Sequence, residues 1–244
     1  MTSTNGGEIC SEDAIASKEL CEYCFDALIN VFTGETMEEP CFPQVFCPLF
    51  VSWNKRGPVN GNGQESGVRM RGCVGTLEAR WLHSALKDFA LRSAFKDRRF
   101  NPISEDEVPF LICTVSLLRA FRPAKGVEDW IIGVNGLIIK FLDPLDQCYR
   151  SATYLPYVAQ ENMWNHYETV DQLIRKSGFN GYISDELRHS LEITVYECSV
   201  FSYSYDDYLQ SRCHQIQPPV KPNGCIINNQ STHNDIHTHT HENE

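Results

Sequence analysis

The sequence predicts an α+β fold for this chain of 244 residues. Apolar residues recur at three- and four-residue spacing in two segments, 11–33 and 80–96, which is the pattern of amphipathic helices. Several other segments are rich in β-forming residues, and Asn135-Gly136 between two apolar runs is typical of a tight hairpin. The length suffices for one large domain, or for one domain with a small companion.

The first half of the chain is expected to form two helices and two strands. The first helix begins near Ser11 and ends at Gly34, because glycine just after an apolar periodic segment is a helix stop signal. The other expected segments are strands at 49–53 and 68–74, an exposed loop at 54–67 and a second helix at 80–96. The loop lacks the Gly-Lys-Ser/Thr ending of a phosphate-binding loop.

The second half is expected to contribute most of the remaining strands. Ser104 and Glu107 have the spacing of a capping box and predict a short helix. Thr169 and Gln172 predict the start of a helix that Gly178 ends. The expected strands are 110–121, 130–134, 137–141, 148–155 and 191–203, and 205–212 is expected to add a short final helix.

The two ends of the chain differ in composition from the part between them. Residues 1–13 are polar and acidic, and residues 214–244 are rich in Pro, Asn, Gln, Thr and His. Because neither end offers apolar surface to bury, both are expected to be disordered, and the folded domain is assigned to 14–213. The ends carry charges of −3 and −2, which leaves −6 of the total of −11 on the domain.

The acidic balance and the cysteine content limit the classes of function. A net charge of −11 argues against a dedicated nucleic-acid or anionic-membrane binder, which needs a broad positive surface. Eleven cysteines without a secretory leader fit reduced thiols better than a disulfide framework. No apolar run approaches the roughly 20 residues of a membrane span. The protein is therefore expected in the cytoplasm, the nucleus or both, and not outside the cell.

Residues 71–76, Arg-Gly-Cys-Val-Gly-Thr, form the strongest candidate site and are called the Arg-Gly-Cys motif below. The glycines beside Cys73 let the backbone turn sharply and let a ligand approach its amide groups. Arg69 and Arg71 are expected to lower the pKa of the thiol and to bind an anion, which makes Cys73 a tentative nucleophile. The alternative is a buried cysteine in a tight turn, where glycine is needed only for space.

Two further groups of candidate residues lie beyond the motif. His83, ten residues past Cys73, is a weak candidate for a general base, against a capping or core role. Arg98 or Arg99 is a candidate to join Arg71 around an anionic group, because guanidinium forks recognise anions in bidentate fashion. The alternative is a surface ion pair with Asp97 beside the end of the second helix.

Two cysteine and histidine patterns indicate metal or redox chemistry only superficially. Cys21 and Cys24 have redox or zinc spacing, but both lie on the apolar stripe of the first helix, which favours core packing. The histidines of the tail lie in a segment too flexible to form a catalytic cage. The sequence therefore indicates no metal site and no cofactor.

The Arg-Gly-Cys motif resembles the hallmark Arg-Gly-Cys-Ile/Val-Gly-Thr motif of the AMMECR domain family. Further blocks that resemble the family in the same order are Pro48–Trp53, Leu82–Leu86, Ser93–Phe100, Ala152–Pro156 and Leu173–Gly178. The resemblance covers about residues 15–212 and is strongest to the eukaryotic branch, named for the Alport, midface hypoplasia and elliptocytosis chromosomal region. Val74 replaces the commoner Ile, and Ser177 replaces a small Gly or Ala.

The resemblance implies a largely antiparallel sheet flanked by helices, with a smaller subdomain that encloses a cleft beside the motif. It also implies a link, through prokaryotic fusions and gene neighbourhoods, to a dioxygenase-like family and a radical S-adenosylmethionine family. Such a link points to a modification pathway. The family itself has no settled activity.

Two hypotheses about function remain open at this point. In the first, the protein is a component of a protein or nucleotide modification pathway that depends on Cys73 as nucleophile or covalent carrier. In the second, it is a non-catalytic adaptor or regulator of a larger assembly, such as a ubiquitin ligase. Both expect protein partners and a small anionic ligand in the cleft. The binding residues expected are Arg71, Gly72, Gly75, Thr76, Asp97, Arg98 and Phe100.

Overall fold

A single six-stranded antiparallel sheet organises the chain in a computed structural model that describes residues 14–58, 61 and 67–216. The strand order is β2-β1-β3-β6-β4-β5, so β2 and β5 are the edge strands. The strands are β1 (Phe46–Arg56), β2 (Val68–Trp81), β3 (Leu111–Pro123), β4 (Asn135–Leu142), β5 (Tyr149–Tyr154) and β6 (Glu192–Ser204). The α+β class expected from the sequence is confirmed.

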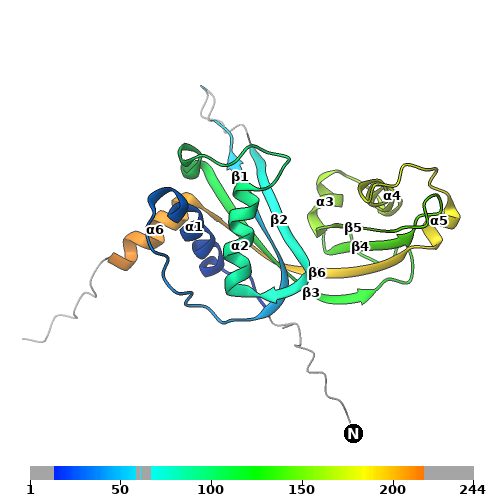
Figure 1. Cartoon of the computed structure of the whole chain (residues 1–244), viewed down its shortest axis with the longest axis horizontal. Helices are drawn as coiled ribbons and strands as arrows, with labels where there is room; N and C mark the ends of the chain where they lie inside the picture. Colours follow the sequence, from blue (N-terminus) through cyan, green and yellow to red (C-terminus); the bar gives the residue numbers. More distant parts are fainter. Residues whose placement is uncertain (1–13, 59–60, 62–66, 217–244) are drawn as a thin grey trace, which may run out of the picture.

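Helices cover the two ends of this sheet (Figure 1). They are α1 (Lys18–Thr33), α2 (Leu82–Phe95), the 3₁₀ helix η1 (Glu105–Phe110), α3 (Pro156–Glu161), α4 (His166–Lys176), α5 (Asp185–His189) and α6 (Tyr205–Ile216). Figure 1 shows α1, α2 and α6 around the end formed by β1 and β2, and α3, α4 and α5 beside β4 and β5.

A first hydrophobic core lies between the sheet and helices α1 and α2. Alternation along β1 sends Leu49, Val51 and Trp53 to the face that these helices cover, which is called the helical face below. Trp53 is fully buried and donates its indole N–H to the Ala90 carbonyl of α2 at 2.9 Å. That bond satisfies the polar atom of the largest buried side chain and fixes α2 against the sheet.

A second core forms at the other end, where α4 packs against β4 and β5 and where β6 also contributes side chains. Leu137 and Ile139 of β4, Val195 of β6 and Leu173 of α4 are almost completely buried there. A third, smaller cluster lies on the sheet face opposite the helical face, and it includes Leu118, Leu155 and Tyr196. This third cluster joins the two ends of the molecule.

The expected hairpin at Asn135-Gly136 is wrong. Residues 130–134 form no strand, and β4 begins only at Asn135. The turn lies before β4 instead, at Gly133, which takes the left-handed conformation with φ of 82°. Asn135 closes this turn by accepting the Ile131 N–H on its side chain at 3.0 Å. Gly136 is needed for space instead, since an added Cβ would meet the Tyr196 ring at 2.3 Å.

Some helix ends agree with the sequence, but α1 begins at Lys18 with Ser17 as its N-cap, so the predicted start near Ser11 is wrong. The capping box of Ser104 and Glu107 is present before η1, and Gly34 ends α1 in the left-handed conformation. The expected cap at Thr169 is wrong, because Asn165 forms the capping box of α4 with Glu168. Helix α6 extends to Ile216, three residues into the predicted tail. Residues 1–13 and 217–244 lie outside the described part of the chain.

Candidate functional site

The Arg-Gly-Cys motif lies in the middle of the edge strand β2. Cys73 pairs with Ser52 of β1, so both side chains point away from the helical face that Trp53 occupies. By the same alternation, Gly72, Val74 and Thr76 face the helices. The motif therefore divides between two faces. Cys73 and Gly75 lie on the face of the third cluster, whereas Gly72 and Thr76 lie on the helical face.

The two glycines of the motif are required by packing. A Cβ on Gly72 would lie 1.9 Å from the Ser93 carbonyl oxygen of α2. A Cβ on Gly75 would lie 2.2 Å from the Leu49 carbonyl oxygen and 2.4 Å from the Phe50 ring. Both approaches are far shorter than van der Waals contact. The expected ligand cradle is thus corrected: protein atoms fill the space beside both glycines.

Arg71 does not contact the thiol, which corrects its expected role in activating Cys73. Its guanidinium donates to both carboxylate oxygens of Glu107, at 2.9 and 2.7 Å, and the side chain is only 11% exposed. Glu107 also accepts from Lys55 at 2.9 Å. The Arg71 guanidinium, aided by Lys55 and opposed by burial, holds the pKa of the Glu107 carboxyl far below its ordinary value. Arg71 therefore stabilises the strand by an ion pair.

Asp97 and Arg99 hold the backbone of Cys73 from the open side of the edge strand. Asp97 accepts the Cys73 N–H at 2.9 Å, and Arg99 donates to the Cys73 carbonyl at 3.2 Å. The two side chains also pair with each other at 2.7 Å. Arg99 lowers the pKa of Asp97 to about 2, with burial opposing. In effect the pair replaces a neighbouring strand at this position, which covers exposed backbone groups of the edge.

The structure selects Arg99 and not Arg98 as the arginine beside the motif. Arg98 is exposed and forms no hydrogen bond or ion pair with any residue of the described part. Arg99 is 58% exposed and lies over the Phe100 ring at 5.4 Å. Both arginines follow α2 directly, so sequence position alone did not separate them.

The Cys73 thiol is half-buried in the third cluster, near Leu118, Tyr157 and Cys198. Burial raises its pKa above the ordinary value, and the Ser52 hydroxyl and the charge of Arg99 offset this only in part. The lowering of the thiol pKa that was expected from Arg69 and Arg71 is therefore wrong in direction. A thiol in this environment is mostly protonated at neutral pH and is a weak nucleophile.

Lys176, at the end of α4, belongs to the candidate site but was not among the site residues predicted from the sequence. Its ammonium donates to the Thr153 carbonyl at 2.8 Å and lies 4.4 Å from the centre of the Tyr154 ring. Burial, followed by repulsion from Arg99, lowers the pKa of Lys176. Its charge also acts on the Cys73 thiol, so the end of α4 lies close to the motif. Only its place in the block Leu173–Gly178 hinted at importance.

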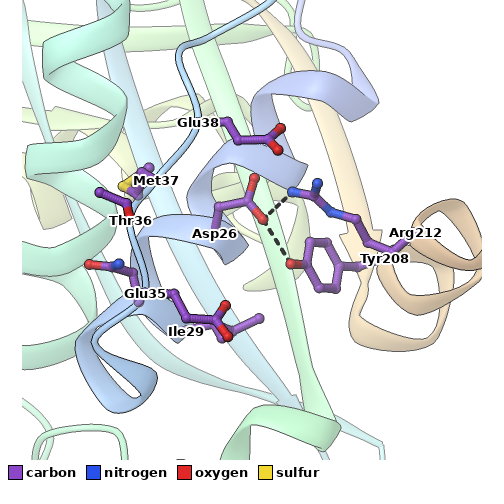
Figure 2. A pocket seen from close by; sticks show the side chains of 9 residues that line it. Asp26, Ile29, Glu35, Thr36, Met37, Glu38, Tyr208 and Arg212 are labelled. Carbon is purple, nitrogen blue, oxygen red and sulfur yellow. Dashed lines mark hydrogen bonds and ion pairs between the residues drawn. The ribbon is translucent and has the colours of Figure 1, made fainter. Parts of the chain in front are cut away.

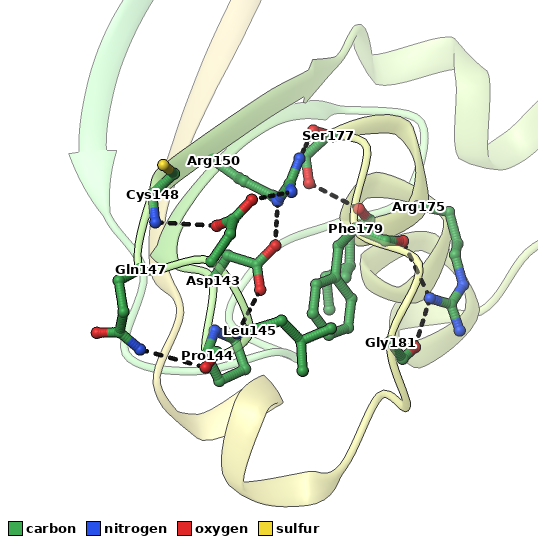
Figure 3. Close-up of polar contacts among 12 residues, drawn as sticks. Asp143, Pro144, Leu145, Gln147, Cys148, Arg150, Arg175, Ser177, Phe179 and Gly181 are labelled. Atoms are coloured by element: carbon green, nitrogen blue, oxygen red, sulfur yellow. Dashed lines mark hydrogen bonds and ion pairs between the residues drawn. The ribbon is translucent and has the colours of Figure 1, made fainter.

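A polar network holds the end of α4 from which Lys176 projects (Figure 3). Arg150 bonds to the buried Asp143 and to Asp146, and it donates to the Ser177 carbonyl at 3.4 Å. Arg175 donates to the carbonyls of Phe179 and Gly181, at 3.0 and 2.7 Å. These bonds fix the last turn of the helix and the chain that leaves it. Lys176 is therefore presented from a rigid support.

The remaining predicted site residues lie outside this cluster. His83 bonds through its ring to the Phe42 carbonyl at 2.9 Å and packs edge-on against the Phe42 ring. It belongs to α2 on the helical face, so it is not placed to serve Cys73 as a base, and that expectation is wrong. The Thr76 hydroxyl accepts the Glu78 N–H at 3.0 Å, which is a local strand contact.

A shallow basin of about 630 Å³ opens beside the motif. Three arginines line it, Arg69, Arg71 and Arg99, together with Phe100, and its carboxylate, Glu107, is engaged by Arg71 and Lys55. The basin is therefore positive within a chain of net charge −11. Arg99 borders the basin and also holds Cys73, so it links the basin to the motif.

A second hollow, of about 270 Å³, lies between α1 and α6 (Figure 2). There Asp26 of α1 accepts from Tyr208 at 2.7 Å and from Arg212, both of α6. The polar groups at the centre of this hollow bond to one another, and these bonds hold α6 against α1. No pattern in the sequence indicated this contact.

The buried cysteines of the first helix are core residues. Cys21 and Cys24 are fully buried, as is Cys113 of β3, and burial raises the pKa of the Cys24 thiol. The structure thus favours the core-packing alternative over a redox or zinc site. Within residues 14–58, 61 and 67–216, no helix has the length and apolar character that a membrane crossing requires.

Comparisons with known proteins agree on one family. The AMMECR1 family model matches residues 21–201. An uncharacterised protein of Arabidopsis thaliana is 44% identical over 194 residues, which cover 80% of this chain and 88% of the relative. An uncharacterised protein of Schizosaccharomyces pombe is 35% identical over 199 residues, with 80% and 96% covered.

A solved structure has a similar fold. The crystal structure of an uncharacterised protein from Pyrococcus horikoshii matches with a TM-score of 0.62 and covers 78% of this chain and 94% of its own. Sequence identity is 22%, so this likeness concerns the fold alone.

Proposed function

Because this chain belongs to the AMMECR1 family, we propose that it acts as a recognition domain that binds an anionic group of a protein or nucleotide-derived partner at Cys73, Arg99 and Lys176. One observation carries the proposal. Two cations, Arg99 from the segment after α2 and Lys176 from α4, lie near each other beside the half-buried Cys73 thiol. Lys176 forms no ion pair with a carboxylate of the described part.

Two neighbouring cations repel each other, and Asp97 compensates only Arg99, to which it is paired at 2.7 Å. Repulsion from Arg99 already lowers the pKa of Lys176, after the effect of burial. A phosphate or carboxylate between them would remove this repulsion and gain charge-assisted hydrogen bonds from both. Tyr154, beneath the Lys176 ammonium, offers an aromatic surface for the rest of the ligand. The arrangement therefore suits an anionic group attached to a larger partner.

Titration with inorganic phosphate and pyrophosphate, followed by backbone amide chemical shifts, tests the anion site. We expect Lys176→Gln to weaken binding by about tenfold, because it removes one charge-assisted contact. Arg99→Gln is expected to weaken it at least as much, since the change also releases Asp97. Arg98→Gln is the matched control and should bind like the wild type. Equal behaviour of the Lys176 and Arg98 variants, or no saturable binding, would refute the site.

A second candidate function, a Cys-dependent step in a modification pathway, has one observation in its favour. The charges of Arg99 and Lys176 both act to lower the pKa of the Cys73 thiol, although burial outweighs them. An enzyme of this kind needs a thiolate near neutral pH. Recognition needs only a fixed thiol that packs against the ligand. The raised thiol pKa is therefore the reason to prefer recognition.

The rate of iodoacetamide labelling against pH separates these two functions. Mass spectrometry of the Cys73 peptide is required, because Cys41, Cys148 and Cys213 are also exposed to the reagent. We expect the Cys73 profile to rise only above about pH 8.5, the ordinary thiol value. Cys73→Ser is expected to retain phosphate binding. If the midpoint of the labelling profile lies well below pH 8.5 and Cys73→Ser loses function, the Cys-dependent enzyme becomes the favoured function.

Recognition without catalysis corresponds to an adaptor or regulatory protein. Such a protein would bring an anion-bearing partner to a larger assembly, for which a ubiquitin ligase is one candidate. The experiment that bears on this role is the comparison of partner binding in wild type and Lys176→Gln. If partner binding depends on Lys176, the anion site is the docking point.

A further inference from the structure

A long groove follows the outer side of α2, on the helical face of the sheet and away from Cys73. It consists of two adjoining hollows, of about 840 and 580 Å³, which share Asp88 and Arg92 in their linings. The first hollow begins at Trp81, whose side chain is 47% exposed, and the second ends at Phe95 and Lys96. We call this surface, from Trp81 to Lys96, the α2 groove.

The α2 groove has apolar side chains at its two ends, and the charged pair of Asp88 and Arg92 lies between them. Trp81 packs edge-on against Phe46 at one end, with ring centres 5.2 Å apart, and Leu91 and Phe95 line the other end. Helix α2 has 14 residues, so the groove extends for about 21 Å, or close to four helical turns. Figure 1 shows α2 running along the outside of the molecule. This length and shape match helix-in-groove recognition.

The charges around the groove are positive after internal pairing. Each carboxylate of the lining is already paired, Glu78 with Arg80 at 2.9 Å and Asp88 with Arg92 at 2.7 Å. Lys96 in the lining and Lys87 on the same helix are exposed and form no ion pair with a described residue. The chain as a whole has a net charge of −11, so the sign of the charge on this surface is opposite to that of the whole chain.

From the apolar side chains at both ends of the α2 groove and the exposed Lys87 and Lys96, we infer that it binds an acidic amphipathic helix of a protein partner. The apolar stripe of that helix lies over Trp81, Leu91 and Phe95, and its carboxylates lie beside Lys87 and Lys96. Charge complementarity at a rim sets the choice of partner and the association rate more than the affinity. This surface and the anion site are distinct and carry separate contacts.

Binding of synthetic helical peptides, measured by fluorescence anisotropy, tests the inference on the full-length protein. The probe is a peptide of roughly 16 residues with Leu and Phe on one face and Glu elsewhere, long enough for four turns. Two matched probes have Lys in place of Glu, or the same composition with the apolar stripe scrambled. We expect the acidic amphipathic probe to bind and both matched probes to bind at least about tenfold more weakly.

Variants of the protein locate the contact. Lys96→Glu is expected to weaken binding of the acidic probe by about tenfold. The matched control is Lys140→Glu on β4, where the side chain is 52% exposed, and it should leave binding unchanged. Leu91→Asp tests the apolar contact, and circular dichroism confirms that each variant is folded. If Leu91→Asp fails to fold, the two lysine variants still decide the question. Absence of binding, or equal binding by all three probes or both lysine variants, would overturn the inference.

Discussion

Gly72→Ala is expected to lower the free energy of unfolding by about 3 kcal/mol, because overpacking a tight helix-to-sheet contact forces the backbone to move. The added Cβ would lie 1.9 Å from the Ser93 carbonyl oxygen and 2.9 Å from its carbonyl carbon. Both neighbours are backbone atoms of α2, so no side-chain rotation relieves the overlap. Urea denaturation followed by circular dichroism measures the loss.

The matched control for Gly72 is Gly126→Ala. No atom lies within 4 Å of a Cβ at Gly126, and its φ is outside the left-handed region. We expect this variant to change stability by less than about 0.5 kcal/mol, as is usual for exposed positions. If Gly72→Ala proves as stable as Gly126→Ala, α2 does not approach β2 as closely as described. The interpretation of Gly72 as making room for a ligand would then be favoured again.

Glu107→Gln is expected to lower the free energy of unfolding by about 3 kcal/mol, since it leaves two partly buried cations without a counterion. Arg71 and Lys55 are 11% and 20% exposed, and both donate to this carboxylate. Glutamine keeps the size of the side chain but has no charge to offer them. Urea is the suitable denaturant, because guanidinium salts would screen the ion pairs.

The pH dependence of this loss has a definite sign. The pKa of Glu107 is depressed in the folded state, first by Arg71, so its stabilisation is complete above the ordinary value of 4.5 and is lost as the pH falls further. The difference between wild type and variant should therefore be constant from pH 7 to about pH 5 and shrink below that. Glu105→Gln, an exposed change on the same 3₁₀ helix, is the control. A difference that grows on acidification would contradict the ion pair.

These stability effects bear directly on how the Arg-Gly-Cys motif is interpreted. Arg71 and Gly72 serve the strand and its contact with α2, while Asp97 and Arg99 hold the Cys73 backbone. A loss of function in variants of Arg71 or Gly72 would therefore report a loss of structure first. Lys176 is the more informative position, because its ammonium bonds to the Thr153 carbonyl and lies over the Tyr154 ring but forms no ion pair with a described residue.

Much of the fold was predictable because local interactions decide it. The apolar stripe of α1, its stop at Gly34 and the capping box at Ser104 depend on residues within a few positions of one another. The hairpin at Asn135-Gly136 failed for the opposite reason. Gly136 is required by Tyr196, which is distant in sequence, and the left-handed turn residue is Gly133.

The sequence by itself determined the α+β class, the bounds of α2 to within two residues, the stop of α1 at Gly34 and the place of the motif. Only the tertiary structure decided what the motif does: which arginine reaches Cys73, that Arg71 is engaged by Glu107, and that Lys176 lies near the thiol. The direction of the thiol pKa depended on the structure for the same reason. Burial and charge act through space, and the groups that act on Cys73 here include Ser52 of β1, Arg99 after α2 and Lys176 at the end of α4, which are distant from one another in the sequence.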